Sequence, residues 1–303
     1  MIRSNKLSNF TERILCDRRP ITADVFLTDF CNNRCSYCRY KDKRTGKYIT
    51  LSEFQSIAMR LHELGVRGII LTGGGEPTIN PQFEGICAWL EEQRIDYGVN
   101  TNMNELKFVR PNFVKVSVDS GDRDRYAEIR GVDTLNKVLH NLKTYVLWKC
   151  LNSPQTKVGV QCVAQSAEQV RSFYEVVKDI AVDYIQFRPL ETRNKQIEYS
   201  SILHAIDGLQ DKRIVRSYKF ELTDYRPDHC IGNWSVITVD VNGNVPYCCH
   251  RPDEVIASVF DDDILRRLQN YTPDMSKCET PCRLSGANHF METFSKENDI
   301  YFV

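Results

Sequence analysis

Three cysteines within one eight-residue segment are the most reactive feature of this sequence. They are Cys31, Cys35 and Cys38, in the segment CNNRCSYC. A zinc site usually has four protein ligands, whereas three thiolates leave one position of a metal centre open. Three cysteines can also hold an iron–sulfur cube with one iron free to bind another ligand. The spacing therefore indicates an open iron–sulfur site, with a zinc loop or reactive surface thiols as alternatives.

Four cysteines in the last third of the chain have spacings that also suit metal ligands. Cys230 and Cys248 flank a glycine-containing stretch, and three residues separate Cys278 from Cys282. Zinc sites more often use paired C-x2-C units. The pattern therefore indicates a second metal site, for which a four-cysteine structural zinc site is one interpretation.

The overall composition restricts where this chemistry takes place. The chain has 303 residues, 42% of them hydrophobic, and its 40 basic residues balance 40 acidic ones, so no net field attracts nucleic acid or an anionic membrane. No signal peptide and no run of ~18 apolar residues is present, and we expect a cytoplasmic protein without membrane contact. Twelve cysteines in that compartment indicate metal or redox chemistry. Cys16, Cys87 and Cys150 have no ligand partner nearby and are expected in the core or on the surface.

Short β-rich segments alternate with longer amphipathic ones from about residue 21 to 190. Six strand-then-helix units of this kind predict an α/β fold with a parallel sheet, open or closed into a full or partial barrel, whose active site lies on the loops after the strands. The predicted strands are residues 23–29, 68–73, 97–102, 114–120, 157–164 and 184–190, and the predicted helical segments are 50–65, 81–94, 134–150 and 166–180.

The last third of the sequence has a different character. A polar connection with a short helix is expected at residues 191–224. A small α+β unit with a β-hairpin at the VNGN turn, a segment FELTDYR and a short helix DDDILRRLQNY should follow. The predicted domains are an N-terminal extension (1–20), a barrel (21–190), the connection (191–224), and a C-terminal module with its tail (225–303).

A glycine-rich segment, TGGGEP at residues 72–77, follows the second predicted strand. It lacks the GxxxxGK[ST] and GxGxxG patterns of phosphate-binding loops. With the cysteine trio after the first strand, it resembles the radical S-adenosylmethionine (radical SAM) enzymes. The resemblance implies a partial (β/α)6 TIM-like barrel, a [4Fe-4S] cluster and S-adenosylmethionine on its open iron. Reductive cleavage would give a 5'-deoxyadenosyl radical, with the electron from a flavodoxin- or ferredoxin-type protein.

The same resemblance implies cofactor contacts along the barrel. The implied residues are Tyr37 beside the adenine, Gly74, Gly75, Glu76 and Pro77 at the methionyl ammonium, and Ser117, Asp119 and Arg130 at the ribose and methionyl carboxylate. A helix N-cap for Asp119 and a solvated ion pair for Arg130 are the alternatives. In YGVNTN, Met103 replaces the glycine of the family's TNG segment, which leaves the roles of Asn100 and Asn102 open.

The fifth and sixth predicted strands carry polar residues that alternate with apolar ones. We expect one residue of each pair to face the barrel interior and contact cofactor or substrate. The pairs are Gln161 with Cys162, and Gln186 with Arg188. Gln161 is the candidate cofactor contact. Cys162 is either a hydrogen-atom donor or a small buried apolar residue. Arg188 either clamps a substrate carboxylate or phosphate, or forms a surface salt bridge.

The second cysteine group resembles the auxiliary-cluster module known as SPASM, or its shorter form, twitch. The resemblance implies a further [4Fe-4S] cluster on Cys230, Cys248, Cys278 and Cys282. Cys249 is adjacent to Cys248, so the second ligand stays ambiguous. With four ligands the cube would carry electrons, and with three it would keep an open iron for substrate. His229, His250 and His289 flank these cysteines and are expected in ordinary polar roles.

The expected function is hydrogen abstraction from a small molecule, sugar or nucleoside-type substrate, followed by oxidation of the product radical through the auxiliary cluster. Only thirty residues precede Cys31, which disfavours a leader-peptide domain and hence a peptide substrate. The alternatives are a redox-neutral isomerisation or epimerisation, a peptide-modifying enzyme and, more remotely, a zinc-binding interaction protein.

Overall fold

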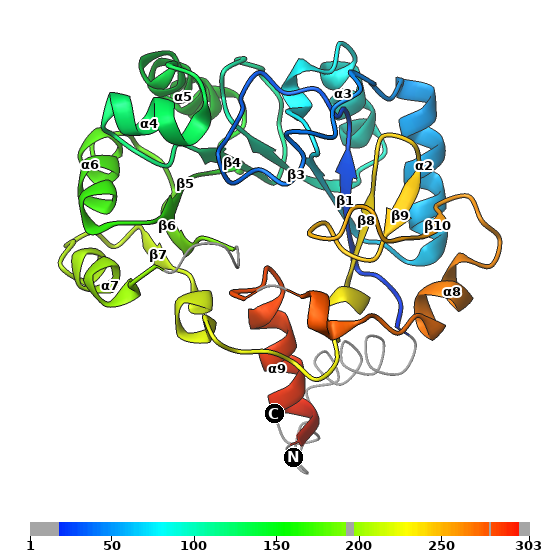
Figure 1. The fold of residues 1–303 in the computed structure, drawn as a ribbon. Helices are drawn as coiled ribbons and strands as arrows, with labels where there is room; N and C mark the ends of the chain where they lie inside the picture. Colours follow the sequence, from blue (N-terminus) through cyan, green and yellow to red (C-terminus); the bar gives the residue numbers. More distant parts are fainter. Residues whose placement is uncertain (1–17, 192–196, 279, 297–303) are drawn as a thin grey trace, which may run out of the picture.

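A single parallel sheet of eight strands organises the computed structural model of the protein, which describes residues 18–191, 197–278 and 280–296. The strand order is β7-β6-β5-β4-β3-β2-β1-β8, and every neighbouring pair is parallel. The sheet curves into a partial barrel with helices on its outer side (Figure 1). The strands are β1 Thr22–Phe26, β2 Gly68–Thr72, β3 Asp96–Thr101, β4 Phe113–Ser117, β5 Lys157–Ala164, β6 Tyr184–Pro189, β7 Ile214–Arg216 and β8 Val236–Val239.

Helices cross over between most of these parallel strands. The α-helices are α2 Leu51–Leu64, α3 Phe83–Glu92, α4 Arg123–Arg130, α5 Leu135–Asn152, α6 Ala167–Val177, α7 Tyr199–Asp207, α8 Ile264–Asn270 and α9 Ser285–Lys296. Short 3-10 turns are η1 Pro77–Ile79, η2 Tyr218–Leu222, η3 Gly232–Trp234 and η4 Met275–Lys277. Helix α2 shows why the ends fall where they do: Thr50 and Glu53 form a capping box, and Gly65 ends the helix with φ 99°.

The six predicted strands and four predicted helices of the barrel are confirmed, with two differences. Residues 102–112, between β3 and β4, form no helix, because Asn102 and Asn104 bond to neighbouring loops instead. Helix α4 is an additional element after β4. It begins at Asp122, whose Oδ1 accepts from the backbone N–H of Arg125 at 2.8 Å.

The turn predicted at VNGN is present, but its two strands belong to different sheets. Gly243 has φ +77°, and its N–H donates to the Asp240 carbonyl at 3.0 Å. Strand β8 before the turn pairs with β1, whereas β9 (Asn244–Pro246) after the turn pairs antiparallel with β10 (Val255–Ser258). By joining the barrel, β8 covers the otherwise open edge of β1. FELTDYR begins in the 3-10 turn η2 and is not a strand.

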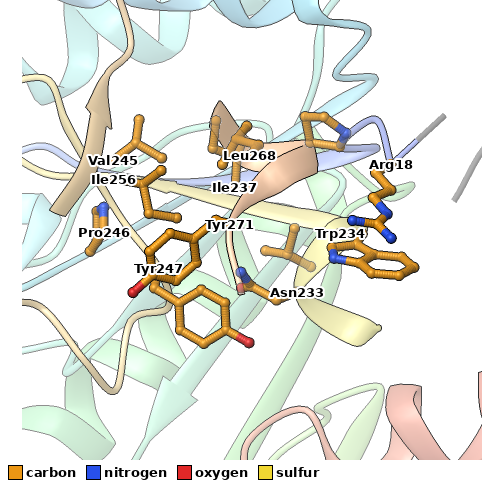
Figure 2. Close-up of a pocket in the computed structure, with 12 residues that line it drawn as sticks. Arg18, Asn233, Trp234, Ile237, Val245, Pro246, Tyr247, Ile256, Leu268 and Tyr271 are labelled. Atoms are coloured by element: carbon orange, nitrogen blue, oxygen red, sulfur yellow. The ribbon is translucent and has the colours of Figure 1, made fainter. Parts of the chain in front are cut away.

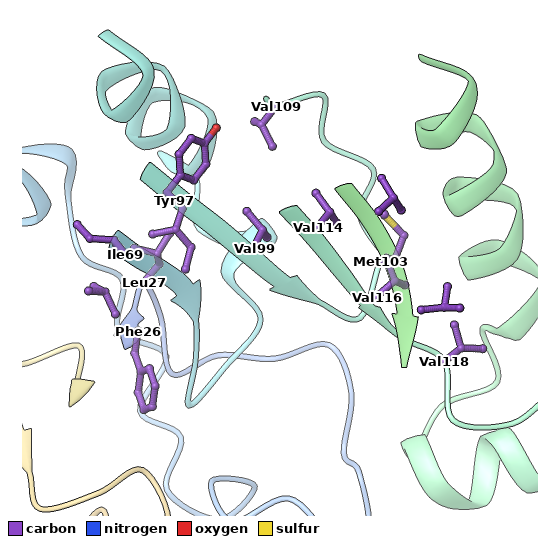
Figure 3. Close-up of a cluster of buried hydrophobic side chains, with 14 of the residues drawn as sticks. Phe26, Leu27, Ile69, Tyr97, Val99, Met103, Val109, Val114, Val116 and Val118 are labelled. Atoms are coloured by element: carbon purple, nitrogen blue, oxygen red, sulfur yellow. The ribbon is translucent and has the colours of Figure 1, made fainter. Parts of the chain in front are cut away.

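The main hydrophobic core lies between the outer face of the sheet and the helices. Val99, Val114 and Val116 on adjacent strands belong to it, as does Met103 (Figure 3). Because side chains alternate along a strand, the residues between these valines face the barrel interior. On β4 they are Lys115 and Ser117.

Aromatic rings fill part of the barrel interior. A Cβ on Gly98 would lie 2.1 Å from the Phe113 ring, and one on Gly159 would lie 2.0 Å from the Tyr184 ring. Both glycines are therefore needed to seat these rings against the inner face of the sheet. The remaining inner positions include polar side chains of β3 to β6.

A small apolar pocket joins the C-terminal strands to the barrel edge (Figure 2). Ile237 of β8, Val245 of β9 and Ile256 of β10 line it with Tyr247 and other side chains. The side chains of Arg18 and Trp234 close one end, with the guanidinium 4.1 Å from the ring centre. The pocket packs the β9–β10 pair against the barrel.

Helices long and apolar enough to span a bilayer are not found among the described residues. Residues 1–17 of the predicted N-terminal extension (1–20), which include Cys16, lie outside the described residues.

Candidate active site

The first cysteine group lies on the loop that follows β1. Asp29 accepts hydrogen bonds from the backbone N–H groups of Gly46 and Lys47 at 2.8 and 2.9 Å. Arg44 Nη1 donates to the carbonyl oxygen of Cys31 at 3.1 Å. These bonds fold the chain after the cysteines back onto the start of the loop and hold the thiols near the carboxyl end of the strand.

The thiols of Cys31, Cys35 and Cys38 are partly buried and close enough to affect one another. Burial, followed by the charges of Glu76 and Cys35, raises the pKa of Cys31 to about 11. Burial also raises the pKa of Cys35, and Cys38 contributes to that rise. Thiolates that repel one another in this way are stabilised by a shared cationic metal centre. The donor set therefore fits a metal cluster.

Polar groups point at one of these sulfurs. The backbone N–H of Asn33 donates to Cys31 Sγ at 3.4 Å, and Asn102 Nδ2 lies 3.8 Å from the same atom. Such donors favour the thiolate form that a cluster requires. Among the described residues, no three His, Cys, Asp or Glu side chains converge on the position of a single metal ion.

The glycine-rich loop after β2 is tied to the cysteine loop. The backbone N–H groups of Gly75 and Glu76 donate to the carbonyl oxygens of Thr28 and Phe30 at 3.0 and 2.8 Å. A Cβ on Gly75 would lie 2.0 Å from the Phe30 carbonyl oxygen, and one on Gly74 would lie 3.1 Å from the Tyr40 ring. Only glycine at position 75 permits this contact between the two backbones.

Glu76 is buried and joins the loops after β2 and β3. Its Oε1 accepts from the hydroxyls of Thr78 and Thr101, both at 2.7 Å, and its Oε2 accepts from the backbone N–H of Asn102 at 2.7 Å. Burial raises the pKa of this carboxyl, although these bonds oppose the rise. Pro77 begins η1 directly afterwards. The structure thus gives Glu76 a role in holding the two loops, and a contact with the methionyl ammonium stays a prediction.

Tyr37, Asp119 and Arg130 form one buried network. Asp119 Oδ2 accepts from the Tyr37 hydroxyl at 2.6 Å and from Arg130 Nη1 at 2.8 Å. Asp119 Oδ1 accepts from the backbone N–H of Val163 at 2.9 Å. The two alternatives do not hold, because Asp122 caps α4 and the Asp119–Arg130 pair is buried. Three of the implied cofactor contacts are therefore brought together.

Asp119 also adopts an uncommon backbone conformation, with φ +68°. This left-handed geometry is costly for a residue with a side chain and persists only where surrounding bonds enforce it. Here the bonds to Arg130 and Val163 do so. The strained turn after β4 is consistent with a functional position.

Of the residue pair on β5, Gln161 faces the barrel interior and Cys162 faces the helices. Ser117 and Gln161 are partners in the β4–β5 register. Cys162 is fully buried in the core, and its thiol contacts the Asp119 carbonyl oxygen at 3.1 Å. The thiol of Cys162 cannot reach a substrate in the barrel. Cys162 is therefore a small buried apolar residue and not a hydrogen-atom donor.

The four cysteines of the second group are close to one another. The charge of Cys230 raises the pKa of both Cys248 and Cys282, and Cys278 adds to the rise at Cys282, after the larger effects of burial and of the neighbour Cys249. Asn288 Nδ2 donates to Cys230 Sγ at 3.6 Å. The structure thus gathers four thiols from three separate segments.

Cys249 contacts the side chain of Cys248 and also faces the barrel. Arg283 Nη1 contacts Cys249 Sγ at 2.9 Å, and the same guanidinium pairs with Asp24 on β1. His229 is exposed, and His289 lies 3.3 Å from the Tyr218 hydroxyl. His250 contacts Glu191, 3.3 Å from Nε2 to Oε2. Because Cys249 is bound to Arg283 and Cys230 affects Cys248, Cys248 is the favoured ligand of the two.

A pocket at the mouth of the barrel lies between the two cysteine groups. Cys38 and Tyr37 line it from the first cysteine loop, and Cys249 and His250 line it from the second group. Its other lining residues include Phe26, Tyr40, Thr72, Gly73, Val163, Arg188, Glu191 and Arg283. This pocket therefore has Cys38 of the first group on one side and the neighbour of Cys248 on another.

Glu191 binds several cations at one wall of this pocket. Its Oε1 pairs with Arg188 Nη1 at 2.9 Å and with Lys219 Nζ at 2.6 Å. Burial alone would raise the pKa of Glu191, but Arg188 and Lys219 outweigh it and hold the pKa well below its usual range. Arg188 is thus neither a surface residue nor free, since part of its guanidinium is committed to Glu191.

Replacing Glu191 with glutamine should destabilise the protein by about 3 kcal/mol, because Arg188 and Lys219 would keep buried charges without a counter-ion. A carboxyl with a lowered pKa contributes stability above its unfolded pKa and loses it as the pH falls. The deficit in the free energy of unfolding should therefore be the same at about pH 6 and about pH 8. Urea unfolding measures it, with Glu168→Gln on the surface of α6 as the control. A deficit under about 0.5 kcal/mol would contradict the assignment.

Residues 25–146 match the family model described as the radical SAM superfamily. The match starts in β1, spans the three cysteines and the GGEP segment, and ends in α5. The chain belongs to the radical SAM superfamily. Its cofactors are accordingly S-adenosylmethionine and a [4Fe-4S] cluster, for which Cys31, Cys35 and Cys38 are the fitting donors. When bound, S-adenosylmethionine and the cluster supply a 5'-deoxyadenosyl radical for hydrogen abstraction.

Named relatives of this radical SAM enzyme include GTP 3',8-cyclases. A probable GTP 3',8-cyclase of Sulfurisphaera tokodaii is 27% identical over 243 residues, 75% of either chain. GTP 3',8-cyclase of Clostridium perfringens is 32% identical over 153 residues, 45% of this chain and 44% of that one, so this match spans less than half of the relative.

Solved structures share the fold. Streptococcus suis SuiB bound to precursor peptide SuiA superposes with a TM-score of 0.64 over 86% of this chain and 67% of that one. At 13% identity, the likeness shows the fold alone.

Several residues at the pocket were not singled out from the sequence. Glu191, Lys219 and Arg283 lie in irregular segments or 3-10 turns, and only the tertiary structure brings them together. Lys115 could have been found, because it stands between Val114 and Val116 on a predicted strand and so had to face the barrel interior.

Proposed function

We propose that this radical SAM enzyme acts on a nucleotide-type small molecule in the pocket at the barrel mouth, with an auxiliary [4Fe-4S] cluster beside it. One observation carries the proposal: Cys38 of the first cysteine group lines this pocket together with Cys249, the sequence neighbour of Cys248 in the second group. A substrate held there lies between the site where the radical forms and a second site that can take up an electron.

The barrel residues would position the first cofactor. Tyr37, Asp119 and Arg130 form a rigid hydrogen-bonded unit beside Cys35, suited to the adenosine and methionyl carboxylate. Ser117 and Gln161 lie next to one another on the inner face. The residues proposed to surround the methionyl group are Gly74, Gly75, Glu76 and Pro77.

Cys230, Cys248, Cys278 and Cys282 would hold the auxiliary cluster. Four thiols, several of them near enough to raise one another's pKa, favour a fully ligated cube, which relays electrons and does not bind substrate through iron. The proposed domains are the barrel at 21–190, the connection at 191–224 and the C-terminal module at 225–303, with β7 of the connection and β8 of the module extending the barrel sheet. A flavodoxin- or ferredoxin-type protein is the proposed reductant.

The substrate class rests on the relatives, whose names specify a purine nucleotide. Oxidation of the product radical is the leading reaction, because an electron acceptor would lie beside the pocket. Redox-neutral isomerisation is the second candidate, since Cys249 presents a thiol to the same pocket. Mass spectrometry of the product separates them, because oxidation removes two hydrogens and isomerisation removes none.

Replacing Cys282 with alanine tests the auxiliary cluster. We expect bound iron to fall from about eight to about four per chain, because one of two cubes is lost. Reduction with dithionite should still give 5'-deoxyadenosine, since the first cluster is untouched.

The neighbouring thiols provide the control for this experiment. Cys248→Ala should lose the same iron as Cys282→Ala, whereas Cys249→Ala should keep the full amount. Equal iron in Cys282→Ala and the parent would refute the ligand assignment. Colourless protein with bound zinc would refute the enzyme proposal and favour structural zinc.

A further inference from the structure

We propose that the inner wall of the barrel binds a phosphate group of the substrate between Lys115 on β4, Arg188 on β6 and Arg283 before α9. The inference rests on the proposed function, because it takes the barrel pocket as the substrate site. It adds the chemical group by which the substrate is held.

Lys115 is an ammonium group on the inner face of the barrel with no anion bound to it. Its neighbours in the register, Asn100 on β3 and Gly159 on β5, offer it no negative charge. Within the described residues its Nζ has no hydrogen-bond partner. Lys115 is half-buried, so its unpaired ammonium is open to an anion that enters the barrel.

Lys149 shows how this chain satisfies a buried lysine that has a structural role. Lys149 Nζ donates to Asp183 Oδ2 at 2.7 Å and to the Thr156 carbonyl oxygen at 3.0 Å. Lys115 has neither kind of partner. The contrast separates a lysine that completes the fold from one left open toward a cavity.

Lys115 also lies in a field of like charges. Burial, followed by the charges of Arg188, Arg283 and Lys219, lowers its pKa to about 8, opposed by Asp24. Arg188, Lys219 and Arg283 also interact with Glu191. Four cations thus surround two carboxylates, which leaves two positive charges in excess, or one if Cys249 is ionised.

The auxiliary cysteines do not remove this excess. If Arg283 is assigned wholly to them, Lys115, Arg188 and Lys219 still face only Asp24 and Glu191. Nearby positive charges in a partly buried site are stable only with an anion between them. The excess is one or two positive charges, which a phosphate covers by either count, and its several oxygens can accept from more than one of these cations.

Arg188 has a donor available for such a group. Its Nη1 is bound to Glu191, but its Nε is buried and has no partner in the described structure. Arg188 and Arg283 both line the pocket at the barrel mouth. A phosphate entering there can accept from Arg188 Nε and lies on the same inner face as Lys115, with β5 between their two strands.

Inorganic pyrophosphate is the probe for this site. We expect calorimetric titration of the anaerobically reconstituted full chain to show binding that Lys115→Met weakens about tenfold or more, because a charge-assisted contact is lost. Lys178→Met, which removes a surface lysine paired with Glu175, is the matched control and should bind as the parent does.

Thermal unfolding gives an independent measurement. Lys115→Met should unfold at the same temperature as the parent or higher, because an unpaired charge is replaced by an apolar side chain. Pyrophosphate should raise the unfolding temperature of the parent more than that of the variant. Lys115→Arg, which keeps the charge, should retain most of the binding.

Three outcomes would overturn the inference: no binding of pyrophosphate to the parent, equal binding by Lys115→Met and the parent, or tighter binding of citrate than of pyrophosphate. The last would indicate a carboxylate site. The proposed function is tested separately by 5'-deoxyadenosine formation in the parent. Pyrophosphate binding without that product would leave the phosphate site standing and refute the function.

Discussion

Alanine in place of Cys35 will abolish the formation of 5'-deoxyadenosine from S-adenosylmethionine. Cys31, Cys35 and Cys38 lie on one loop, and each interacts with another thiol of the trio. A cube held by three thiolates has no protein ligand to spare, because its fourth iron binds the substrate sulfonium compound. Loss of one cysteine should therefore remove the cluster, and with it about four of the bound irons.

Anaerobic reconstitution, iron analysis and chromatography of the nucleoside product measure this effect. Cys31→Ala and Cys38→Ala should behave as Cys35→Ala does. Cys150→Ala, at an exposed cysteine on α5, is the matched control and should keep full iron and full product. Product formation by any variant of the trio at the parent rate would show that these thiols do not hold the catalytic cluster.

Methionine in place of Arg130 will destabilise the protein by about 3 to 5 kcal/mol, because it leaves the buried carboxylate of Asp119 without its cation. Arg130 Nη1 lies 2.8 Å from Asp119 Oδ2 and 3.1 Å from the Tyr37 hydroxyl. Asp119 also holds a left-handed backbone that these bonds stabilise. Binding of S-adenosylmethionine should weaken as well, since Tyr37 loses one of its two hydrogen-bond partners.

Chemical unfolding measures the stability loss, and a cofactor titration measures the binding. The double variant Asp119→Asn with Arg130→Met should recover part of the stability, since it removes the uncompensated charge. Arg125→Met, at an exposed pair with Glu128, should change the free energy of unfolding by less than about 0.5 kcal/mol. An Arg130→Met protein as stable as the parent would show that the pair does not support the fold.

Local patterns in the sequence determined the barrel and the first cysteine site. Alternation of strands and helices is encoded in apolar spacing, which acts over a few residues. The cysteine trio and the GGEP segment each lie within one loop, so their spacing carries their geometry. The directions in which the side chains of Gln161 and Cys162 face also followed from strand alternation, because the outward face of the strand is apolar.

The tertiary structure alone decided how distant segments combine. It placed β8 beside β1 instead of in a hairpin, because an open sheet edge offers hydrogen bonds that no local pattern reveals. It also gave Cys248 and Cys249, whose side chains contact each other, different further partners, with Cys230 near Cys248 and Arg283 bound to Cys249. Lys115, Arg188 and Arg283 come from separate strands and loops, and their excess charge exists only where the closing barrel brings them into one low-dielectric space.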